Sequence, residues 1–192
     1  MKALEPIELD FEAAQVAGTE KFVKHLTAQM RTALRAQGFK EAQFPRCVYV
    51  IRLKGSFLVA YPRNSSPVLY IGRGVAQQRI TAHLKNWLHH VSNFGIKTAI
   101  EIRIVHPKRQ NRADFFKYVE AQLIADHADR YGALPLFNSK REWSYEACTF
   151  SQDEQKQLSR LIGVGSGNRP WWSIKPEAAN DFRDLYLRGA QY

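Results

Sequence analysis

Three short segments rich in β-branched and aromatic residues constrain the fold of this chain most strongly. Residues 47–53, 68–71 and 98–105 each have the length and composition of a strand. In the last of them isoleucines alternate with charged residues, which is typical of a strand with one buried face. Helical periodicity over residues 76–91 and 114–130 completes the order β-β-α-β-α. We therefore predict an α+β fold with a small three-stranded antiparallel sheet that is covered by helices.

The segments on both sides of this core are predicted to be helical. Between residues 10 and 37 apolar side chains recur every three or four positions, and Gly38 is a suitable helix end. Beyond the core, similar patterns predict helices near residues 152–161 and 177–187. The chain is thus divided into a helical N-terminal extension, a core and a helical C-terminal extension that packs on the core. These parts comprise residues 1–45, 46–140 and 141–192.

The net charge of +10 is concentrated in the middle of the chain. Residues 47–120 contain 12 basic and 3 acidic residues, a balance of +9, whereas the segments before and after are almost neutral. Each Lys or Arg that replaces a condensed counterion on a phosphate backbone adds salt-dependent affinity. The charge alone leaves open whether this is a solvated face or a surface that binds nucleic acid. Membrane binding is not expected, because no long basic amphipathic helix accompanies the charge.

Composition excludes several other classes of protein. Cys47 and Cys148 are the only cysteines, too few for a disulfide framework or for a zinc site without histidine ligands. No apolar run approaches the roughly 18 residues that cross a bilayer. The first residues lack the basic and then apolar order of a signal peptide. We therefore expect a soluble protein of the cytoplasm.

The basic segment contains the few residue types that phosphodiester hydrolysis requires. A water must lose a proton, and cations must neutralise the charge that develops on phosphorus and on the leaving oxygen. Mg²⁺ is a hard cation that keeps most of its water ligands, so one or two protein carboxylates can hold it. The pattern to expect is a lone acid, an arginine, and a His or Tyr near strand ends.

Five landmarks of this kind occur in order within residues 46–140. They are Cys47-Val48-Tyr49, Tyr70-Ile71-Gly72, Arg79 with His83, the helix that carries Glu120, and the Pro-x-x-Asn segment that ends at Asn138. Together they resemble the GIY-YIG nuclease family. The tripeptide that ends at Tyr49 takes the place of the family's first motif, with Cys and Val where the family has Gly and Ile. The spacing from Gly72 to Arg79 is one residue shorter than is usual in the family.

The resemblance implies a role for each aromatic and basic landmark. Tyr49 and Tyr70 would lie side by side on adjacent strands, and one of them, by preference Tyr49, would take or relay the proton of the attacking water. Arg79 would face the pentacovalent phosphate, because its planar fork matches two phosphate oxygens and stays charged. His83 follows Arg79 by four residues and so shares its helical face. It would bind a phosphate oxygen or share the proton transfer.

The resemblance also implies a cofactor. Glu120 would hold Mg²⁺, for which Mn²⁺ would substitute, and Asn138 would brace the site or the scissile phosphate. We expect the side chains of Tyr49, Tyr70, Arg79 and Glu120 to converge on one volume about the size of a hydrated phosphate. The enzyme so described would be a metal-dependent endonuclease that cuts one strand per active site.

DNA is the expected partner, with duplex preferred over single-stranded DNA or RNA. The connection between Tyr49 and Tyr70 is about twice the length found in compact family members, and some restriction-type members share such an insertion. Cutting both strands would require a homodimer or a transient pair. The alternatives are a non-catalytic nucleic-acid-binding module on the same fold and a nuclease for single-stranded DNA or RNA. Candidate nucleic-acid contacts are Lys54, Arg63, Arg73, Lys108, Arg109 and Arg112.

Overall fold

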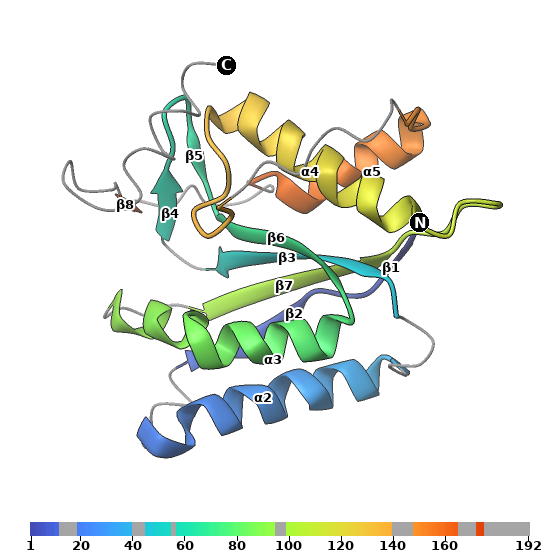
Figure 1. Cartoon of the computed structure of the whole chain (residues 1–192). Coiled ribbons are helices and arrows are strands. Elements are labelled where there is room, and N and C mark those ends of the chain that lie inside the picture. Colours follow the sequence, from blue (N-terminus) through green and yellow to red (C-terminus); the bar gives the residue numbers. More distant parts are fainter. Residues whose placement is uncertain are drawn as a thin grey trace.

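The computed structural model describes seven stretches of the chain, which comprise residues 1–11, 19–39, 45–54, 57–94, 99–139, 148–164 and 172–174. They contain both strands and helices (Figure 1). The elements are β1 (Lys2–Ala3), β2 (Ile7–Asp10), α2 (Thr19–Ala36), β3 (Cys47–Lys54), β4 (Phe57–Ala60), β5 (Ser65–Ser66), β6 (Val68–Gly74), α3 (Ala76–Asn86), the 3₁₀ helix η2 (Leu88–Phe94), β7 (Ala99–His106), α4 (Phe115–Tyr131), α5 (Gln152–Ile162) and β8 (Trp172–Ile174).

A five-stranded antiparallel sheet lies at the centre of the fold. β3 lies between β6 and β7, and the other edge of β7 pairs first with β2 and then with β1. The predicted α+β class and the antiparallel pairing of β3 with β6 are confirmed. The prediction of three strands is wrong, because two strands of the N-terminal segment extend the sheet beyond β7.

β2 is too short for its alternating pattern to be recognised in the sequence. Ile7 and Leu9 are buried against the core while Glu8 and Asp10 are exposed. Four alternating residues rarely decide between strand and loop, and pairing with β7 stabilises this strand. Asp10, predicted to begin a helix, therefore ends a strand, and the N-terminal extension is not purely helical.

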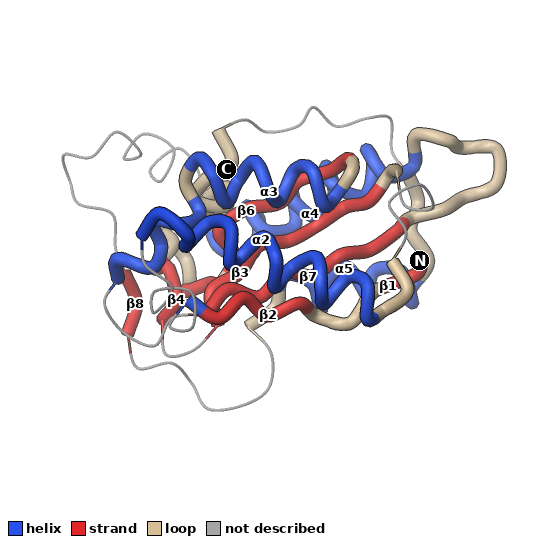
Figure 2. Tube along the Cα trace, turned by 90° about the horizontal axis from the view of Figure 1, so that it is seen from below, coloured by secondary structure: helices blue, strands red, loops and turns tan. Residues whose placement is uncertain are grey.

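Helices cover both faces of the sheet and make a three-layered structure. α2 and α3 lie side by side on one face, and α4 and α5 lie on the other (Figures 1 and 2). Each interface has its own apolar cluster. One includes Leu26 and Met30 of α2 with Ile80 of α3, and the other includes Val119 and Leu123 of α4.

The predicted helices of the core are confirmed with small shifts at their ends. Residues 76–91 form α3 and then the 3₁₀ helix η2, whereas α4 and α5 match the predicted positions closely. α5 begins with a capping box, in which Ser151 and Glu154 exchange side-chain and backbone hydrogen bonds. The helix predicted near residues 177–187 lies outside the described residues.

A second, small sheet forms within the long connection between β3 and β6. β4 pairs antiparallel with β5 and parallel with β8 near the end of the chain. Neither β4 nor β8 was predicted, because each has only three or four residues and its partner is distant in the sequence. Within the described parts of the chain, no helix is long and apolar enough to cross a membrane.

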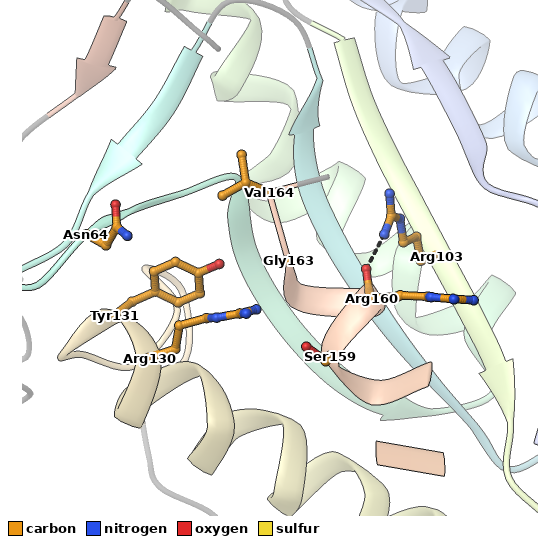
Figure 3. Close-up of a pocket in the computed structure, with 8 residues that line it drawn as sticks. All are labelled: Asn64, Arg103, Arg130, Tyr131, Ser159, Arg160, Gly163 and Val164. Carbon is orange, nitrogen blue, oxygen red and sulfur yellow. Dashed lines mark hydrogen bonds between the residues drawn. The ribbon is translucent and has the colours of Figure 1, made fainter. Parts of the chain in front are cut away.

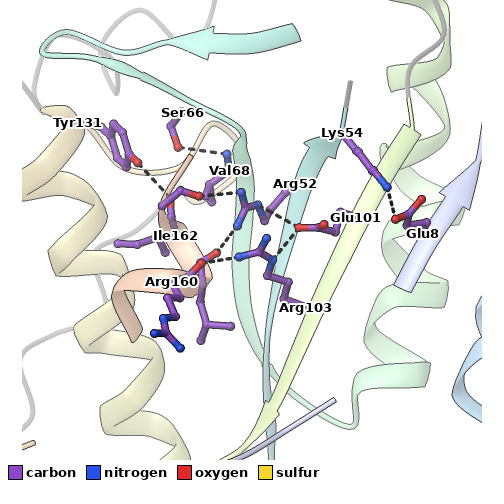
Figure 4. A network of polar contacts seen from close by, with 12 residues as sticks. Glu8, Arg52, Lys54, Ser66, Val68, Glu101, Arg103, Tyr131, Arg160 and Ile162 are labelled. Carbon is purple, nitrogen blue, oxygen red and sulfur yellow. Dashed lines mark hydrogen bonds and ion pairs between the residues drawn. The ribbon is translucent and has the colours of Figure 1, made fainter. Parts of the chain in front are cut away.

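Two arginines attach the end of α5 to the sheet (Figure 4). Arg52 on β3 donates hydrogen bonds to the carbonyl oxygens of Leu161 (2.9 Å) and Gly163 (2.7 Å). Arg103 on β7 donates to the carbonyl oxygen of Arg160 and to Glu101, at 2.6 Å. These carbonyls are at the negative end of the helix dipole, so the guanidinium groups stabilise the helix end. Burial lowers the pKa of Arg52 to about 10, and the charge of Arg103 adds to this shift.

A buried histidine makes the stability of the fold depend on pH. His127 Nδ1 lies 2.9 Å from the carbonyl oxygen of Ala133, to which it donates, and Nε2 then accepts from the hydroxyl of Ser66 at 3.3 Å. Burial lowers the pKa of His127 to about 4. Its ordinary value is about 6.5. The folded state therefore keeps this ring neutral at a pH where the unfolded chain already binds a proton.

We expect the free energy of unfolding to fall as the pH is lowered from 7 towards 4, because His127 binds a proton in the unfolded state but stays neutral in the folded state. His127→Gln should flatten this dependence by at most about 1.4 kcal/mol per pH unit, the value for one proton. Urea unfolding at pH 7, 6 and 5 measures how the free energy of unfolding depends on pH. His90→Gln, at an exposed histidine, is the matched control. Equal pH slopes for His127→Gln and wild type would contradict this account.

Candidate active site

Tyr49 and Tyr70 lie on the same face of the sheet, as predicted. In the pairing of β3 with β6, Tyr49 lies opposite Gly72. Tyr70 precedes Gly72 by two residues on β6, so its side chain projects to the same side. The two ring centroids are 6.1 Å apart. Tyr49 is fully buried, whereas Tyr70 is only partly buried.

Gly72 makes this arrangement possible. A Cβ atom at this position would lie 2.5 Å from Cε1 of Tyr70 and 2.7 Å from the hydroxyl oxygen of Tyr49. Both distances are shorter than non-bonded contact allows, so the two rings occupy the space of the missing side chain. The glycine of the Tyr-Ile-Gly motif is therefore required by packing rather than by backbone conformation.

A sharp turn after β6 brings α3 over the two tyrosines. Gly74 ends β6 with a φ of 121°, a conformation that favours glycine, and α3 begins two residues later. The His83 ring centroid lies 4.5 Å from that of Tyr70 and 5.9 Å from that of Tyr49. Arg79, one turn earlier on α3, is exposed at the mouth of this cluster.

A chain of hydrogen bonds determines which nitrogen of His83 carries the proton. The indole Nε1–H of Trp87 can only donate, and it donates to Nδ1 of His83 at 2.9 Å. Nδ1 is therefore unprotonated, and the hydrogen of the neutral ring is on Nε2. Nε2 lies 2.9 Å from the hydroxyl oxygen of Tyr49 and donates to it. The phenolic hydrogen of Tyr49 must consequently point to another acceptor.

Burial keeps both His83 and Tyr49 uncharged near neutral pH. The pKa of His83 is lowered to about 4, first by burial and then by the charge of Arg79. The pKa of Tyr49 is raised above its ordinary value by burial and by the neighbouring Tyr70, while hydrogen bonding and charge from Arg79 oppose the shift. Hydrogen bonding to Tyr49 in turn raises the pKa of Arg79. At pH 7 the cluster therefore consists of two neutral donors beside one permanent cation.

Glu120 approaches this cluster from the other side of the sheet. It lies on α4, on the face of the sheet opposite α3, and both helices contact the edge strand β6 and its neighbour β3 (Figure 1). Its carboxylate forms an ion pair with Arg73 of β6, and its side chain is 7% exposed. The charge of Glu120 contributes to the raised pKa of Tyr49, so the two groups are within electrostatic range. The predicted convergence of Tyr49, Tyr70, Arg79 and Glu120 is therefore wrong for Glu120, which is buried on the opposite face of the sheet, whereas His83 joins the two tyrosines and Arg79.

The carboxylate of Glu120 fits a divalent cation only under one condition. Within the described part of the chain there is no group of three or more His, Cys, Asp or Glu that could hold a metal ion. Mg²⁺ is nevertheless commonly held by one or two carboxylates together with water and substrate phosphate. Glu120 fits such a shared site if Arg73, whose side chain is 26% exposed, moves away from the carboxylate.

Asn138 supports the site through the backbone of β6. Its Oδ1 accepts from the backbone N–H of Ile71 at 2.9 Å, and its Nδ2 donates to the carbonyl oxygen of Ile71 at 2.8 Å. The backbone N–H of Phe137 also donates to the carbonyl oxygen of Leu69. These bonds pair the backbone groups of Leu69 and Ile71 along the outer edge of β6, on either side of Tyr70. Of the two predicted roles for Asn138, they fit the one in which it braces the site.

Trp87 and Phe137 are the residues of this site that the sequence analysis missed. Their rings stack with centroids 3.9 Å apart, which joins the end of α3 to the Pro-x-x-Asn segment. Trp87 follows His83 by four residues, so the sequence already places both on one helical face. The signal was present, but the periodicity of residues 76–91 indicates only a helix and not which of its aromatic residues lines a site.

The six candidate nucleic-acid contacts do not form one surface. Arg109 and Arg112 precede α4, whereas Arg63 donates to the carbonyl oxygen of Asp129 at its far end. Arg109 also donates to Glu154 at 2.8 Å and lies over the ring of Phe115, which indicates a structural role. The remaining three differ in setting: Lys54 is paired with Glu8, Arg73 is paired with Glu120, and Lys108 is exposed.

A cavity of about 660 Å³ lies between the C-terminal ends of α4 and α5, on the face opposite α3 (Figure 3). Three arginines line it, and one of them, Arg103, already binds Glu101 and the end of α5. The cavity does not include Tyr49, Tyr70 or Arg79. Its lining consists of Asn64, Arg103, Arg130, Tyr131, Ser159, Arg160, Gly163 and Val164.

Comparison with protein-family models, with curated proteins and with solved structures found no match in any of the three.

Replacing Trp87 with Phe should release His83 from its single tautomer, because the ring stack on Phe137 remains while the donor to Nδ1 is lost. We expect the imidazole ¹⁵N shifts of wild type to report hydrogen on Nε2 at pH 7 and those of Trp87→Phe to report a mixture. The exposed His90 gives an internal reference in the same spectra. A wild-type ring with hydrogen on Nδ1 would contradict the hydrogen-bond chain.

Proposed function

We propose that this chain is a metal-dependent endonuclease that hydrolyses phosphodiester bonds of DNA, one strand per active site, as its resemblance to the GIY-YIG family implies. The observation that carries the proposal is the clustering of Tyr49, Tyr70 and His83 under α3, with the exposed Arg79 one turn before His83. Both phenols raise the pKa of Arg79, so its guanidinium is within electrostatic range of them. A phosphate that binds Arg79 would therefore meet two hydroxyl donors in the same place.

Arg79 would hold the scissile phosphate and stabilise its developing charge. Its guanidinium forms up to two parallel hydrogen bonds with phosphate oxygens and remains cationic throughout the reaction. The side chain is exposed, so the phosphate reaches it without rearrangement of the sheet. Its attachment near the start of α3 keeps the charge beside the tyrosines.

Tyr49 would move the proton. Because its pKa is raised, the phenol is protonated before the reaction and can donate its proton to the leaving oxygen as the phosphorus–oxygen bond breaks. The resulting phenolate would be stabilised by Nε2–H of His83 and by Arg79. The water oxygen forms the new bond to phosphorus, and the proton that this water releases restores the phenol. Tyr49 would thus relay the proton between the two oxygens.

Glu120 would hold the Mg²⁺ or Mn²⁺ ion. A divalent cation there would supply Lewis-acid charge that neutralises the phosphate and the leaving oxygen. For this Arg73 must leave the carboxylate, and a phosphate oxygen offers its guanidinium a new partner. One pocket handles one phosphate, so cutting both strands would require two copies of the chain.

The ion pair between Arg73 and Glu120 favours one alternative function. A buried carboxylate that is already neutralised by an arginine is also what a non-catalytic module would contain. Such a module would bind nucleic acid through Arg79 and neighbouring cations, without a need for divalent ions. Recovery of intact DNA in Mg²⁺ and Mn²⁺, with binding unaffected by either ion, would favour this alternative.

Wild-type protein should nick supercoiled plasmid in the presence of Mg²⁺ or Mn²⁺. We expect Arg79→Lys and Tyr49→Phe each to lower the rate by about 10² to 10⁴, because one removes the two-point phosphate contact and the other the transferable proton. The rate of loss of supercoiled DNA on gels measures both. Parallel assays on single-stranded DNA and RNA decide between the substrate classes.

Tyr61→Phe is the matched control for loss of a buried hydroxyl. Tyr61 donates to the carbonyl oxygen of Val68 at 2.7 Å, and the backbone N–H of Leu136 donates to Tyr61. This variant should lose stability but keep its rate per folded molecule. If Tyr49→Phe cleaves as fast as Tyr61→Phe, the relay through Tyr49 is refuted.

Arg73→Gln should bind Mn²⁺ several-fold more tightly than wild type in the absence of DNA, because the competing cation is removed from Glu120. Arg73→Lys, which keeps the charge, should bind like wild type, and Glu120→Gln should lose the site. Electron paramagnetic resonance of free Mn²⁺ measures all three without reference to activity. Weaker Mn²⁺ binding by Arg73→Gln would show that Arg73 does not compete with the metal.

A further inference from the structure

The outer face of α2 carries a stripe of exposed basic side chains. They recur at intervals of three, seven and four residues, which at about 100° per residue places them within roughly 80° of arc. The opposite face of the helix is buried in the core through Phe22, Leu26, Met30 and Leu34. The stripe consists of Lys21, Lys24, Arg31 and Arg35.

The described side chains around this stripe do not pair with it. None of its four members forms an ion pair with another side chain that the structure describes. In sequence, α2 and α3 together contain six basic residues and one acid, whereas α4 and α5 contain four basic and five acidic residues. The helices on the α2 and α3 face are therefore cationic overall, and those on the opposite face are not.

The stripe lies beside the candidate active site. α2 packs along α3, which carries Arg79 and the exposed Lys85 (Figure 2). From Lys21 to Arg35 the helix advances 14 residues, or about 21 Å. A duplex carries one phosphate charge per about 1.7 Å of its axis, so the stripe matches the length of about six base pairs.

We propose that the exposed face of α2 binds the phosphate backbone of duplex DNA and holds it against the mouth of the site at Arg79. The identity of the substrate rests on the proposed function. A lipid surface fits less well, because the apolar face of α2 is buried and cannot enter a bilayer. The N-terminal segment has a nearly balanced overall charge, and the helical spacing of α2 brings four of its basic residues onto one exposed face.

The test compares two paired variants of α2 with a matched pair on the opposite face. Lys21→Gln/Lys24→Gln and Arg31→Gln/Arg35→Gln each remove two charges from the stripe, and Lys156→Gln/Arg160→Gln removes two exposed charges from α5. Fluorescence anisotropy of a labelled 20-base-pair duplex is measured in EDTA over a range of KCl concentrations. Circular dichroism melting confirms that each variant is folded.

Each α2 pair should weaken binding about tenfold at 100 mM salt and reduce the slope of log K against log salt by about 1 to 2. The α5 pair should change neither quantity. Equal slopes for the α2 pairs and wild type would overturn the proposal. So would weaker binding of the α2 pairs to phosphatidylserine vesicles with unchanged binding to DNA.

The binding and cleavage assays distinguish failure of the α2 surface from failure of the proposed hydrolytic function. If wild type binds the duplex through α2 but does not cut plasmid in Mg²⁺, the α2 surface is supported and the hydrolytic function is refuted. If wild type cuts plasmid while the α2 pairs bind and cut normally, the hydrolytic function stands and the α2 surface is refuted.

Discussion

The packing of two tyrosine rings on the backbone of Gly72 is the contact on which the rest of the site depends. It requires the antiparallel register that puts Tyr49 opposite Gly72, and it leaves no room for a Cβ atom. Because the rings fill that space, their hydroxyl groups lie under the first turns of α3. His83 and Arg79 then lie close to Tyr49 and Tyr70. A shift of one residue in the strand pairing would turn a tyrosine side chain to the other face of the sheet.

The edge position of β6 explains how both faces of the sheet contribute to one region. α3 and α4 lie on opposite sides, yet an edge strand lets side chains from each approach around it. The same edge would expose unpaired backbone groups, and the side-chain amide of Asn138 pairs with two of them. Arg73, on this strand, links the edge to Glu120. The strand thus connects the cluster of Tyr49, Tyr70 and Arg79 to the carboxylate of Glu120.

Composition and periodicity correctly predicted those helices and strands whose pattern lies within a single stretch of sequence. β3, β6 and β7 are rich in β-branched residues, and α4 and α5 have clear periodicity or caps, so their positions were close to correct. β1, β2 and β8 have two to four residues and depend on partners far away in the sequence. Loop closure makes such pairings a property of the whole chain, which no short window contains. The additional edge strands and the small second sheet were missed for this reason.

By itself, the sequence determined the spacing of the site. Arg79, His83 and Trp87 follow one another at four-residue steps, which places them on one helical face wherever the helix packs. Only the tertiary structure decided how these groups are protonated and paired. The tautomer and lowered pKa of His83, and the partner of Glu120, depend on burial and on contacts between distant segments. Burial of His83 and pairing between distant segments arise only when the layers of the fold assemble. They therefore cannot be predicted from the sequence around each residue.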